Sequence, residues 1–341
     1  MTPTAYMSAA RRRLAGLGHR SRFLVMSQFM HADRNLALRA ALPDGDWRFE
    51  RALRSVSDVT VYIVRAGHGE TGVLKVATTA SGANSLRREH DVLIRLRSDR
   101  QLDNWLALIP DPLAAGTAGA WTYLLTNRLP GKDSRNPALA ETDCLTSAAI
   151  AAIAPLHRRT EQTRVVDDRL LEFLVDEPAE AIMMSLSCAD VVKRLTGTLR
   201  SDLAGRELTL GWTHGDFHPG NIMLGADRRV TGIVDWDAAR EHDLPTLDVA
   251  FWLLTIPEHG RSRGIGGRVA DRLNRGQPWT TAEERVLADT TAGNLIDGRT
   301  LLLLAWLRHV ASNLAKSARY AESPLWSRRN VTPVLRQVAH G

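Results

Sequence analysis

The chain has 341 residues, of which 44% are hydrophobic and 24% charged, so it can bury a large core in two lobes and is not of disordered composition. The formal net charge of +6 does not indicate a broad nucleic-acid-binding face. Residues 1–54 hold ten arginines and four acidic residues, whereas residues 131–341 hold 26 basic and 27 acidic residues. We therefore expect no nucleic-acid partner, and we interpret the basic arm as a solvated segment or as a weak anion-binding one.

Neither the cysteines nor the apolar runs indicate an extracellular or membrane protein. Cys144 and Cys188 form no metal-binding spacing and no disulfide framework, which favours a reducing, cytoplasmic location. The apolar stretch at 23–26 is too short for a signal peptide. The longest apolar run, Leu301–Leu307, is far below the roughly 20 residues of a membrane span and predicts a buried helix. We expect no membrane partner, and the sequence leaves the oligomeric state open.

Three segments follow one another along the chain. Residues 1–45 are predicted to form a basic helical extension, and residues 46–130 a small lobe with a sheet and one helix. The strands of this lobe are expected at 59–66, 72–77 and 121–127, and its helix at 84–97. A hinge is expected at about residues 126–131, because Pro130 and Gly131 end the last strand there.

The remaining segment, residues 131–341, shows mostly helical patterns. Helices are expected at 146–157, 169–186 and 299–317, and one β-hairpin at 221–236. A small sheet-rich lobe, a hinge and a large helical lobe together predict an α+β, two-lobed protein-kinase-like fold. In this fold the N-lobe is a small antiparallel sheet, and the mostly helical C-lobe carries the catalytic loop and the acceptor site.

The most informative stretch is His-Gly-Asp-Phe-His-Pro-Gly-Asn, which ends at Asn221 and is followed by Asp235, 19 residues after Asp216. Phosphoryl transfer needs a carboxylate that orients or deprotonates the attacking hydroxyl, and oxygen ligands that hold Mg²⁺ on the phosphates. Asp216 suits the first role, and Asn221 and Asp235 suit the second. One alternative is a zinc or iron site at His214, Asp216 and His218, which would leave Asn221 and Asp235 unexplained. The other is a set of ordinary turn residues.

Lys75 is one of only four lysines, against 40 arginines, and it lies in an apolar, β-rich run. On the predicted helix at 84–97, Glu89 falls on the apolar stripe, where a carboxylate needs a counter-charge. We therefore predict a Lys75–Glu89 ion pair, which matches the strand-lysine and helix-glutamate pair of kinases. The alternative is that both side chains reach solvent.

The stretch 214–222, together with 233–236, resembles the catalytic loop and the metal-binding motif of aminoglycoside phosphotransferases and their kinase-like relatives. The resemblance implies that Asp216 is the catalytic base and that Asn221 and Asp235 bind Mg²⁺. It extends over roughly residues 55–255.

The same resemblance implies a nucleotide site in the small lobe. Ser57 begins a Ser-x-x-x-Val-Tyr sequence that is similar to the nucleotide loop of the family. The hinge would hold adenine through the Asn127 carbonyl and the Leu129 amide. His157 resembles the histidine of a Leu-His pair in the family, although a histidine favoured by a helix C-terminus explains it equally well. Asp248 resembles a buried aspartate that braces the catalytic loop.

Residues 161–190 contain eight acidic residues and two arginines. This stretch would attract a cationic acceptor such as a polyamine or an amino sugar, or it forms a solvated helix face.

The sequence therefore predicts a phosphotransferase that moves the γ-phosphate of ATP to a hydroxyl of a small molecule, with Mg²⁺ as cofactor. An aminoglycoside or another amino sugar is one candidate acceptor, and GTP stays open as a donor. A nucleotide-binding pseudokinase and a kinase of protein hydroxyls are the alternatives. His-Gly-Asp in place of His-Arg-Asp, and no obvious Ala-Pro-Glu segment, favour a small acceptor.

Overall fold

The computed structural model describes residue 42 and residues 47–53, 58–135, 137–256, 264–290 and 296–340. The extension predicted at 1–45 therefore lies outside the described residues except for Leu42, and Ser57 lies outside them as well.

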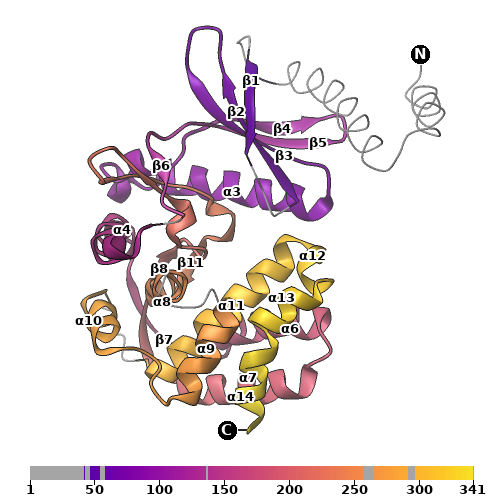
Figure 1. Ribbon diagram of the computed structural model, residues 1–341, viewed down its shortest axis with the longest axis vertical. Coiled ribbons are helices and arrows are strands. Elements are labelled where there is room, and N and C mark those ends of the chain that lie inside the picture. The colour runs from indigo at the N-terminus through magenta and orange to yellow at the C-terminus, as the bar shows by residue number, and fades with distance from the viewer. Residues whose placement is uncertain are drawn as a thin grey trace, which may run out of the picture.

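The upper lobe in Figure 1, here called the N-lobe, is built on a five-stranded antiparallel sheet with the order β1-β2-β3-β5-β4. Its strands are β1 Arg48–Leu53, β2 Val59–Arg65, β3 Thr71–Ala77, β4 Pro112–Ala118 and β5 Trp121–Asn127. The three predicted β-rich runs correspond to β2, β3 and β5. The sequence pattern does not indicate β1, which is rich in charges, or β4, which is rich in small residues. Pairing with β2 and β5 places these two strands in the sheet.

Helix α3, Ala80–Ser98, covers one face of this sheet (Figure 1). Its contact with the sheet is apolar and involves Val59, Ala77, Leu86 and Leu124. The helix begins four residues before the predicted start, because the Thr79 side chain accepts a hydrogen bond from the Gly82 amide and caps the first turn. The opposite face of the sheet has a separate small core that includes Tyr62, Leu74 and Leu125.

The C-lobe contains two three-stranded sheets and most of the helices. Its strands are β6 Lys132–Asp133, β7 Gln162–Val165, β8 Glu207–Thr213, β9 Ile222–Leu224, β10 Val230–Ile233 and β11 Arg240–Asp243. They pair in the orders β10-β9-β6 and β11-β8-β7. Its helices are α4 Thr142–Arg159, α5 Asp168–Leu171, α6 Glu177–Ser185, α7 Ala189–Leu203, α8 Pro245–Thr255, α9 Ile265–Asn274, α10 Thr281–Thr290, α11 Gly298–Lys316, α12 Ala318–Ala321, α13 Pro324–Asn330 and α14 Thr332–His340.

The helix expected at 169–186 is confirmed as one continuous helical segment, formed by α5, a π-helical turn at Glu172–Asp176 and α6. The expectation of a single hairpin in the C-lobe needs correction, because the C-lobe has more strands. In the sheet β11-β8-β7, strand β8 ends directly before the catalytic loop and β11 follows the loop further along the chain. This sheet therefore positions the start of the loop.

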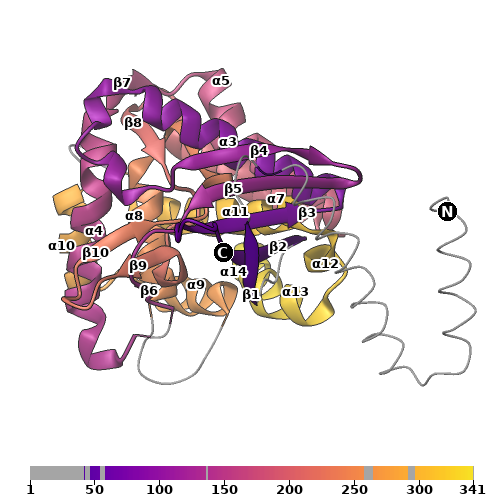
Figure 2. The same ribbon diagram turned by 90° about the horizontal axis from the view of Figure 1, so that it is seen from above.

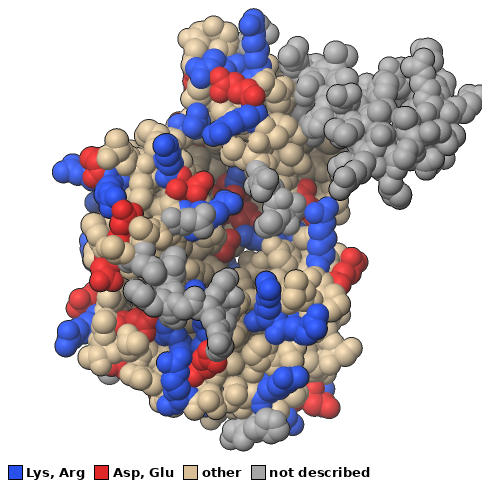
Figure 3. Space-filling view, viewed as in Figure 1, with Lys and Arg blue, Asp and Glu red and all other residues tan. Residues whose placement is uncertain are grey.

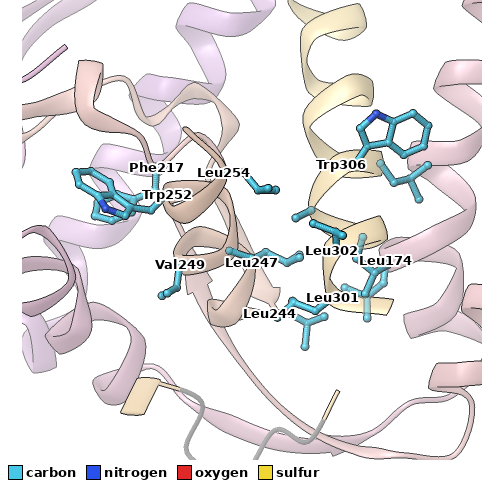
Figure 4. Close-up of a cluster of buried hydrophobic side chains, with 14 of the residues drawn as sticks. Leu174, Phe217, Leu244, Leu247, Val249, Trp252, Leu254, Leu301, Leu302 and Trp306 are labelled. Carbon is cyan, nitrogen blue, oxygen red and sulfur yellow. The ribbon is translucent and has the colours of Figure 1, made fainter. Parts of the chain in front are cut away.

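The core of the C-lobe is centred on α8 and α11. Figure 4 shows Phe217 and Trp252 on one side of this core and Trp306 on α11 on the other, with leucines of both helices between them. The run Leu301–Leu307 belongs to α11 and its side chains are buried, which confirms the predicted buried helix. Seen from above, the sheet of the N-lobe lies over the C-terminal helices (Figure 2). Among the described residues, no helix has the length and apolar content needed to cross a bilayer.

Candidate active site

The loop that carries Asp216 connects β8 to β9 and is braced from below by Asp248 of α8. The carboxylate of Asp248 accepts hydrogen bonds from the His214 amide at 2.7 Å and the Gly215 amide at 2.9 Å. It also lies 3.0 Å from Nε2 of His157, so all three groups converge on one buried acid. Gly215 has φ of +75°, and a Cβ atom there would lie 2.1 Å from the Ala238 carbonyl oxygen. The loop thus requires glycine at this position.

The two histidines of the motif have structural partners. His214 Nε2 lies 2.9 Å from the Val234 carbonyl oxygen, and its Nδ1 accepts a hydrogen bond from the Asp216 amide. His218 Nδ1 accepts a hydrogen bond from the Gly220 amide at 3.0 Å. Among the described residues, no three histidine, cysteine or acidic side chains are grouped as a metal site. The zinc or iron alternative therefore has no support.

The side chain of Asp216 faces a lysine from the far end of the chain. Its Oδ2 lies 2.7 Å from Nζ of Lys316, and its Oδ1 lies 4.0 Å from Nε2 of His218. Its main-chain carbonyl accepts a hydrogen bond from Nδ2 of Asn221 at 3.0 Å, which fixes the loop. Burial disfavours the carboxylate, but the ammonium of Lys316, which is the largest opposing influence, and smaller contributions from the nearby histidines outweigh burial and hold the pKa of Asp216 well below its usual range. Asp216 is therefore ionised.

Lys75 on β3 pairs with Glu89 on α3, as predicted. Nζ of Lys75 lies 2.7 and 2.8 Å from the two carboxylate oxygens of Glu89, and it also contacts Asp235 of the C-lobe. Burial disfavours the ammonium, but the carboxylates of Asp235 and Glu89 outweigh burial and raise the pKa of Lys75. This one cation therefore joins the N-lobe to the end of β10.

Asp235 and Asn221 are brought together by the hairpin of β9 and β10, in which the Val234 amide donates to the Asn221 carbonyl at 2.9 Å. Asp235 has φ of +71°, a left-handed conformation that is rare for a residue with a side chain. The neighbouring Lys75 outweighs burial and lowers the pKa of Asp235 to about 2. Asp235 is half-exposed. It thus presents an ionised carboxylate beside Lys75.

The residues present fit a hard cation such as Mg²⁺. The amide nitrogen of Asn221 is used on the catalytic loop, which leaves its oxygen as an acceptor. Asp237, two residues after Asp235, accepts a hydrogen bond from Ser85 on one oxygen, while its other oxygen is buried and lies 3.3 Å from Nζ of Lys316. Carboxylate and amide oxygens are the ligands that Mg²⁺ prefers. On the face shown in Figure 3, acidic side chains lie in the recess between the lobes.

Two residues of this cluster were not singled out by sequence reasoning. Lys316 ends α11, 100 positions after Asp216, and Asp237 receives the hydroxyl of Ser85 from 152 positions away. A signal for Lys316 was present, because lysine is scarce in this arginine-rich chain and two of the four lysines meet in this cluster.

The predicted adenine contacts remain predictions. Asn127 ends β5, and its side chain accepts a hydrogen bond from the Asp111 amide at 2.7 Å. Leu129 is buried beside Gly232, at the start of the connection to β6. Ser57 lies outside the described residues, but the adjacent Asp58 accepts hydrogen bonds from Ser81 at 2.7 Å and from Ser317 at 2.8 Å.

Three of the eight acids in the stretch at 161–190 are engaged by arginines, so these three do not support a cationic acceptor. Asp168 and Asp176 pair with Arg200 of α7, and Glu177 lies 3.7 Å from Arg240. None of the contacts recorded for these three acids reaches Asp216.

A model of the phosphotransferase enzyme family matches residues 50–287. Among curated protein sequences, none matches the chain. Solved structures with a similar fold include aminoglycoside phosphotransferase APH(4)-Ia, with 14% identity and a TM-score of 0.57 over 90% of this chain and 99% of that chain. Aminoglycoside-3'-phosphotransferase of type VIII is also similar, with 19% identity and a TM-score of 0.52 over 81% of this chain and 98% of that chain. APH(3'')-Id from Streptomyces rimosus has 18% identity and a TM-score of 0.51 over 84% of this chain and 98% of that chain. These likenesses confirm the predicted two-lobed fold.

Proposed function

Since the chain belongs to the phosphotransferase enzyme family, we propose that it transfers the γ-phosphoryl group of ATP to a hydroxyl group of a small molecule, with GTP as the alternative donor. The observation that carries the proposal is the contact of Lys75 with both Glu89 and Asp235, beside the braced loop of Asp216. A fixed cation from one lobe and a carboxylate base from the other are the two groups that phosphoryl transfer requires at one place.

In the proposed reaction, the acceptor hydroxyl donates a hydrogen bond to the Asp216 carboxylate, which orients its oxygen toward the γ-phosphorus. The new oxygen–phosphorus bond forms as the bond from the γ-phosphorus to the bridging oxygen breaks, and ADP leaves with that electron pair. The hydroxyl proton passes to Asp216. Because this transition state is loose, the proton moves late, so a carboxylate of low pKa is adequate.

Other residues are assigned to the donor. Lys75, held in place by Glu89, would bind the phosphates of ATP. Asn221 and Asp235 would hold Mg²⁺, whose chemistry is to neutralise the phosphate charge. We propose that Ser57 belongs to the nucleotide loop and that the main chain at Asn127 and Leu129 holds the adenine.

An amino sugar is one candidate acceptor. One solved structure with a similar fold is a mutant of APH(4)-Ia in a ternary complex with ADP and hygromycin B, at 16% identity and a TM-score of 0.53. This likeness supports testing aminoglycosides first. The contacts of the acidic stretch at 161–190 do not add to that support.

The test is a triphosphate-dependent screen of hydroxyl compounds, read by the mass gain of one phosphoryl group. Amino sugars, other small alcohols and proteins are offered separately, each with ATP and with GTP. The Asp216→Asn variant is the matched control, and it should show no product above background. Transfer to proteins alone would contradict a small acceptor, and nucleotide binding without any transfer would favour the pseudokinase.

A further inference from the structure

Lys316 occupies a position in the site that none of the roles assigned above explains. It is the last residue of α11, and its Nζ lies 2.7 Å from Oδ2 of Asp216 and 3.3 Å from Oδ1 of Asp237. We propose that Lys316 is a further catalytic residue, whose ammonium group binds the phosphoryl group during its transfer from ATP to the acceptor. This inference rests on the proposed function.

The position of this ammonium follows the path of the reaction. Asp216 is the proposed base for the acceptor hydroxyl, and Asp237 lies two residues beyond Asp235, the proposed metal ligand on the donor side. Lys316 bridges the acid on the acceptor side and the acid on the donor side. The reacting oxygen and phosphorus must approach within about 3–3.5 Å of each other before the bond forms. The equatorial oxygens of the phosphoryl group therefore come within reach of a cation that already contacts the base.

The charges in the cluster point to the same role. Four carboxylates, those of Glu89, Asp216, Asp235 and Asp237, meet only two ammonium groups, those of Lys75 and Lys316, among the contacts of the described residues. Lys75 is engaged by Glu89 and Asp235. Lys316 is therefore the ammonium group that pairs with Asp216, the proposed base.

The protonation states agree with this assignment. Burial disfavours the ammonium of Lys316, but the carboxylates of Asp216 and Asp237 outweigh burial and raise its pKa well above the usual value. His218 is also close to the base, but burial lowers the pKa of its imidazole and favours the neutral ring. The side chain of Lys316 is thus positively charged beside the place where the phosphoryl group is transferred. A fixed positive charge at this place stabilises the transition state of phosphoryl transfer.

The residue after Lys316 fixes it between the lobes. Ser317 donates a hydrogen bond to Oδ1 of Asp58 at 2.8 Å, and Arg319 of α12 lies 3.9 Å from the same oxygen. Asp58 immediately precedes β2 and is the second residue of the predicted nucleotide loop. The end of α11 therefore touches the catalytic loop and the N-lobe with two consecutive side chains, which fixes the position of Lys316 between them.

Two other roles would give different measurements. If Lys316 only held Asp216 in position, its loss would leave the contacts with the γ-phosphoryl group intact. If it bound an anionic group of the acceptor, nucleotide affinity would also be unchanged. Only a direct contact with the phosphoryl group makes the lysine distinguish a triphosphate from a diphosphate.

The experiment measures the dissociation constants of Mg·ADP and of Mg·AMP-PNP by calorimetry for the full-length chain. The proteins compared are the wild type, Lys316→Met, Lys316→Arg and the matched control Lys193→Met, whose lysine is exposed on α7. We expect Lys316→Met to bind Mg·ADP within about twofold of the wild type and to lose about tenfold or more in affinity for Mg·AMP-PNP, as for the loss of one charge-assisted hydrogen bond. Lys316→Arg should recover most of this loss, and Lys193→Met should match the wild type.

Each other outcome is decisive. An unchanged ratio of the two dissociation constants in Lys316→Met, whether both affinities fall or neither does, would overturn the inference. A wild type that binds neither nucleotide would instead contradict the proposed function. Thermal melting establishes that each variant is folded, and Lys316→Gln replaces the methionine variant if that one does not fold.

Discussion

Asp216 and Asp235 carry the same carboxylate in different surroundings, which is consistent with the different roles that we propose for them. Asp216 is held by Lys316 on a braced loop, whereas Asp235 is half-exposed beside Lys75 with a left-handed backbone. Loss of a residue that orients the acceptor should leave nucleotide binding unchanged, whereas loss of a residue that holds the metal should weaken nucleotide binding.

We expect Asp216→Asn to bind Mg·ATP almost normally while turnover falls by about 10²–10⁴-fold, because the base for the hydroxyl proton is lost. Asp235→Asn should fail at nucleotide binding, because both the metal ligand and a partner of Lys75 are weakened. Calorimetry with Mg·ATP and turnover on a verified acceptor separate the two. Near-normal turnover of Asp216→Asn would disprove the assigned mechanism.

The Lys75–Glu89 pair gives a prediction about stability. The side chains are 11% and 3% exposed, so removal of the lysine leaves a buried carboxylate whose remaining neighbours are acidic. Lys75→Met should lower the free energy of unfolding by about 3 kcal/mol, and the added change Glu89→Gln should restore part of that loss. Urea unfolding of the two variants measures both. Equal stability of Lys75→Met and the wild type would show that the pair is not energetically coupled to the fold.

At the scale of elements, the loop after β8 depends on a glycine that no other residue can replace. Gly215→Ala would place Cβ 2.1 Å from a carbonyl oxygen at positive φ, so the loop must shift and carry Asp216 with it. We expect a loss of turnover of at least about tenfold and a lower melting temperature. The matched control is Gly197→Ala on α7, where a Cβ atom would meet nothing within 4 Å. This control should be neutral or slightly stabilising, because alanine favours the helix.

Helix α11 carries His309, from which we expect a dependence of the stability on pH. His309 stacks on Phe251 at 5.1 Å, and burial lowers the pKa of its ring to about 4, although Asp216 acts in the opposite direction and His218 and Lys316 act in the same one. Between pH 4 and the unfolded value of about 6.5, the unfolded chain binds more protons than the folded one, so stability is lost as the pH falls through this window.

When the pH has fallen below the whole window, His309 should have lowered the free energy of unfolding by about 2 kcal/mol. The value is moderate because the ring is only partly buried. His309→Gln should flatten the dependence on pH. Urea unfolding at pH 4.5 and 7 tests this, and the same slope in both proteins would assign the effect to other groups such as His218, whose pKa is also lowered.

At the scale of the whole molecule, polar contacts between the two lobes surround the proposed nucleotide site, in addition to the apolar packing of α3 on the core of the C-lobe. Lys75 reaches Asp235, Ser85 reaches Asp237 and Ser317 reaches Asp58. A ligand that binds across this junction stabilises both lobes at once.

Mg·ATP at 100 times its dissociation constant should raise the free energy of unfolding by about 2.7 kcal/mol, and EDTA should remove most of this gain. The measurement is the melting temperature with nucleotide alone, with Mg²⁺ alone and with both. Asp235→Asn serves as the control and should show little gain. The same gain with EDTA present would argue against a role for the metal.

The sequence by itself determined the Lys75–Glu89 pair, and it indicated the chemistry that we propose for the loop of Asp216. A short motif, a β-rich run or a helical period in the sequence indicates each of them. Such patterns depend on local turn geometry and on the burial of nearby side chains. The resemblance of residues 214–236 then supplied the roles. For the same reason β1, β4 and the sheet β11-β8-β7 were missed, since pairing with partners rather than local preference holds them in place.

Only the tertiary structure decided which residues surround Asp216. Lys316 and Ser317 reach the site because α11 packs on α8 and ends between the lobes, 100 positions after the base and 259 positions after Asp58. No local pattern encodes contacts at such separations, because they arise from the packing of buried leucines and tryptophans rather than from the polar residues that finally meet. The scarcity of lysine marked Lys316 as unusual, but its partner was decided by the fold.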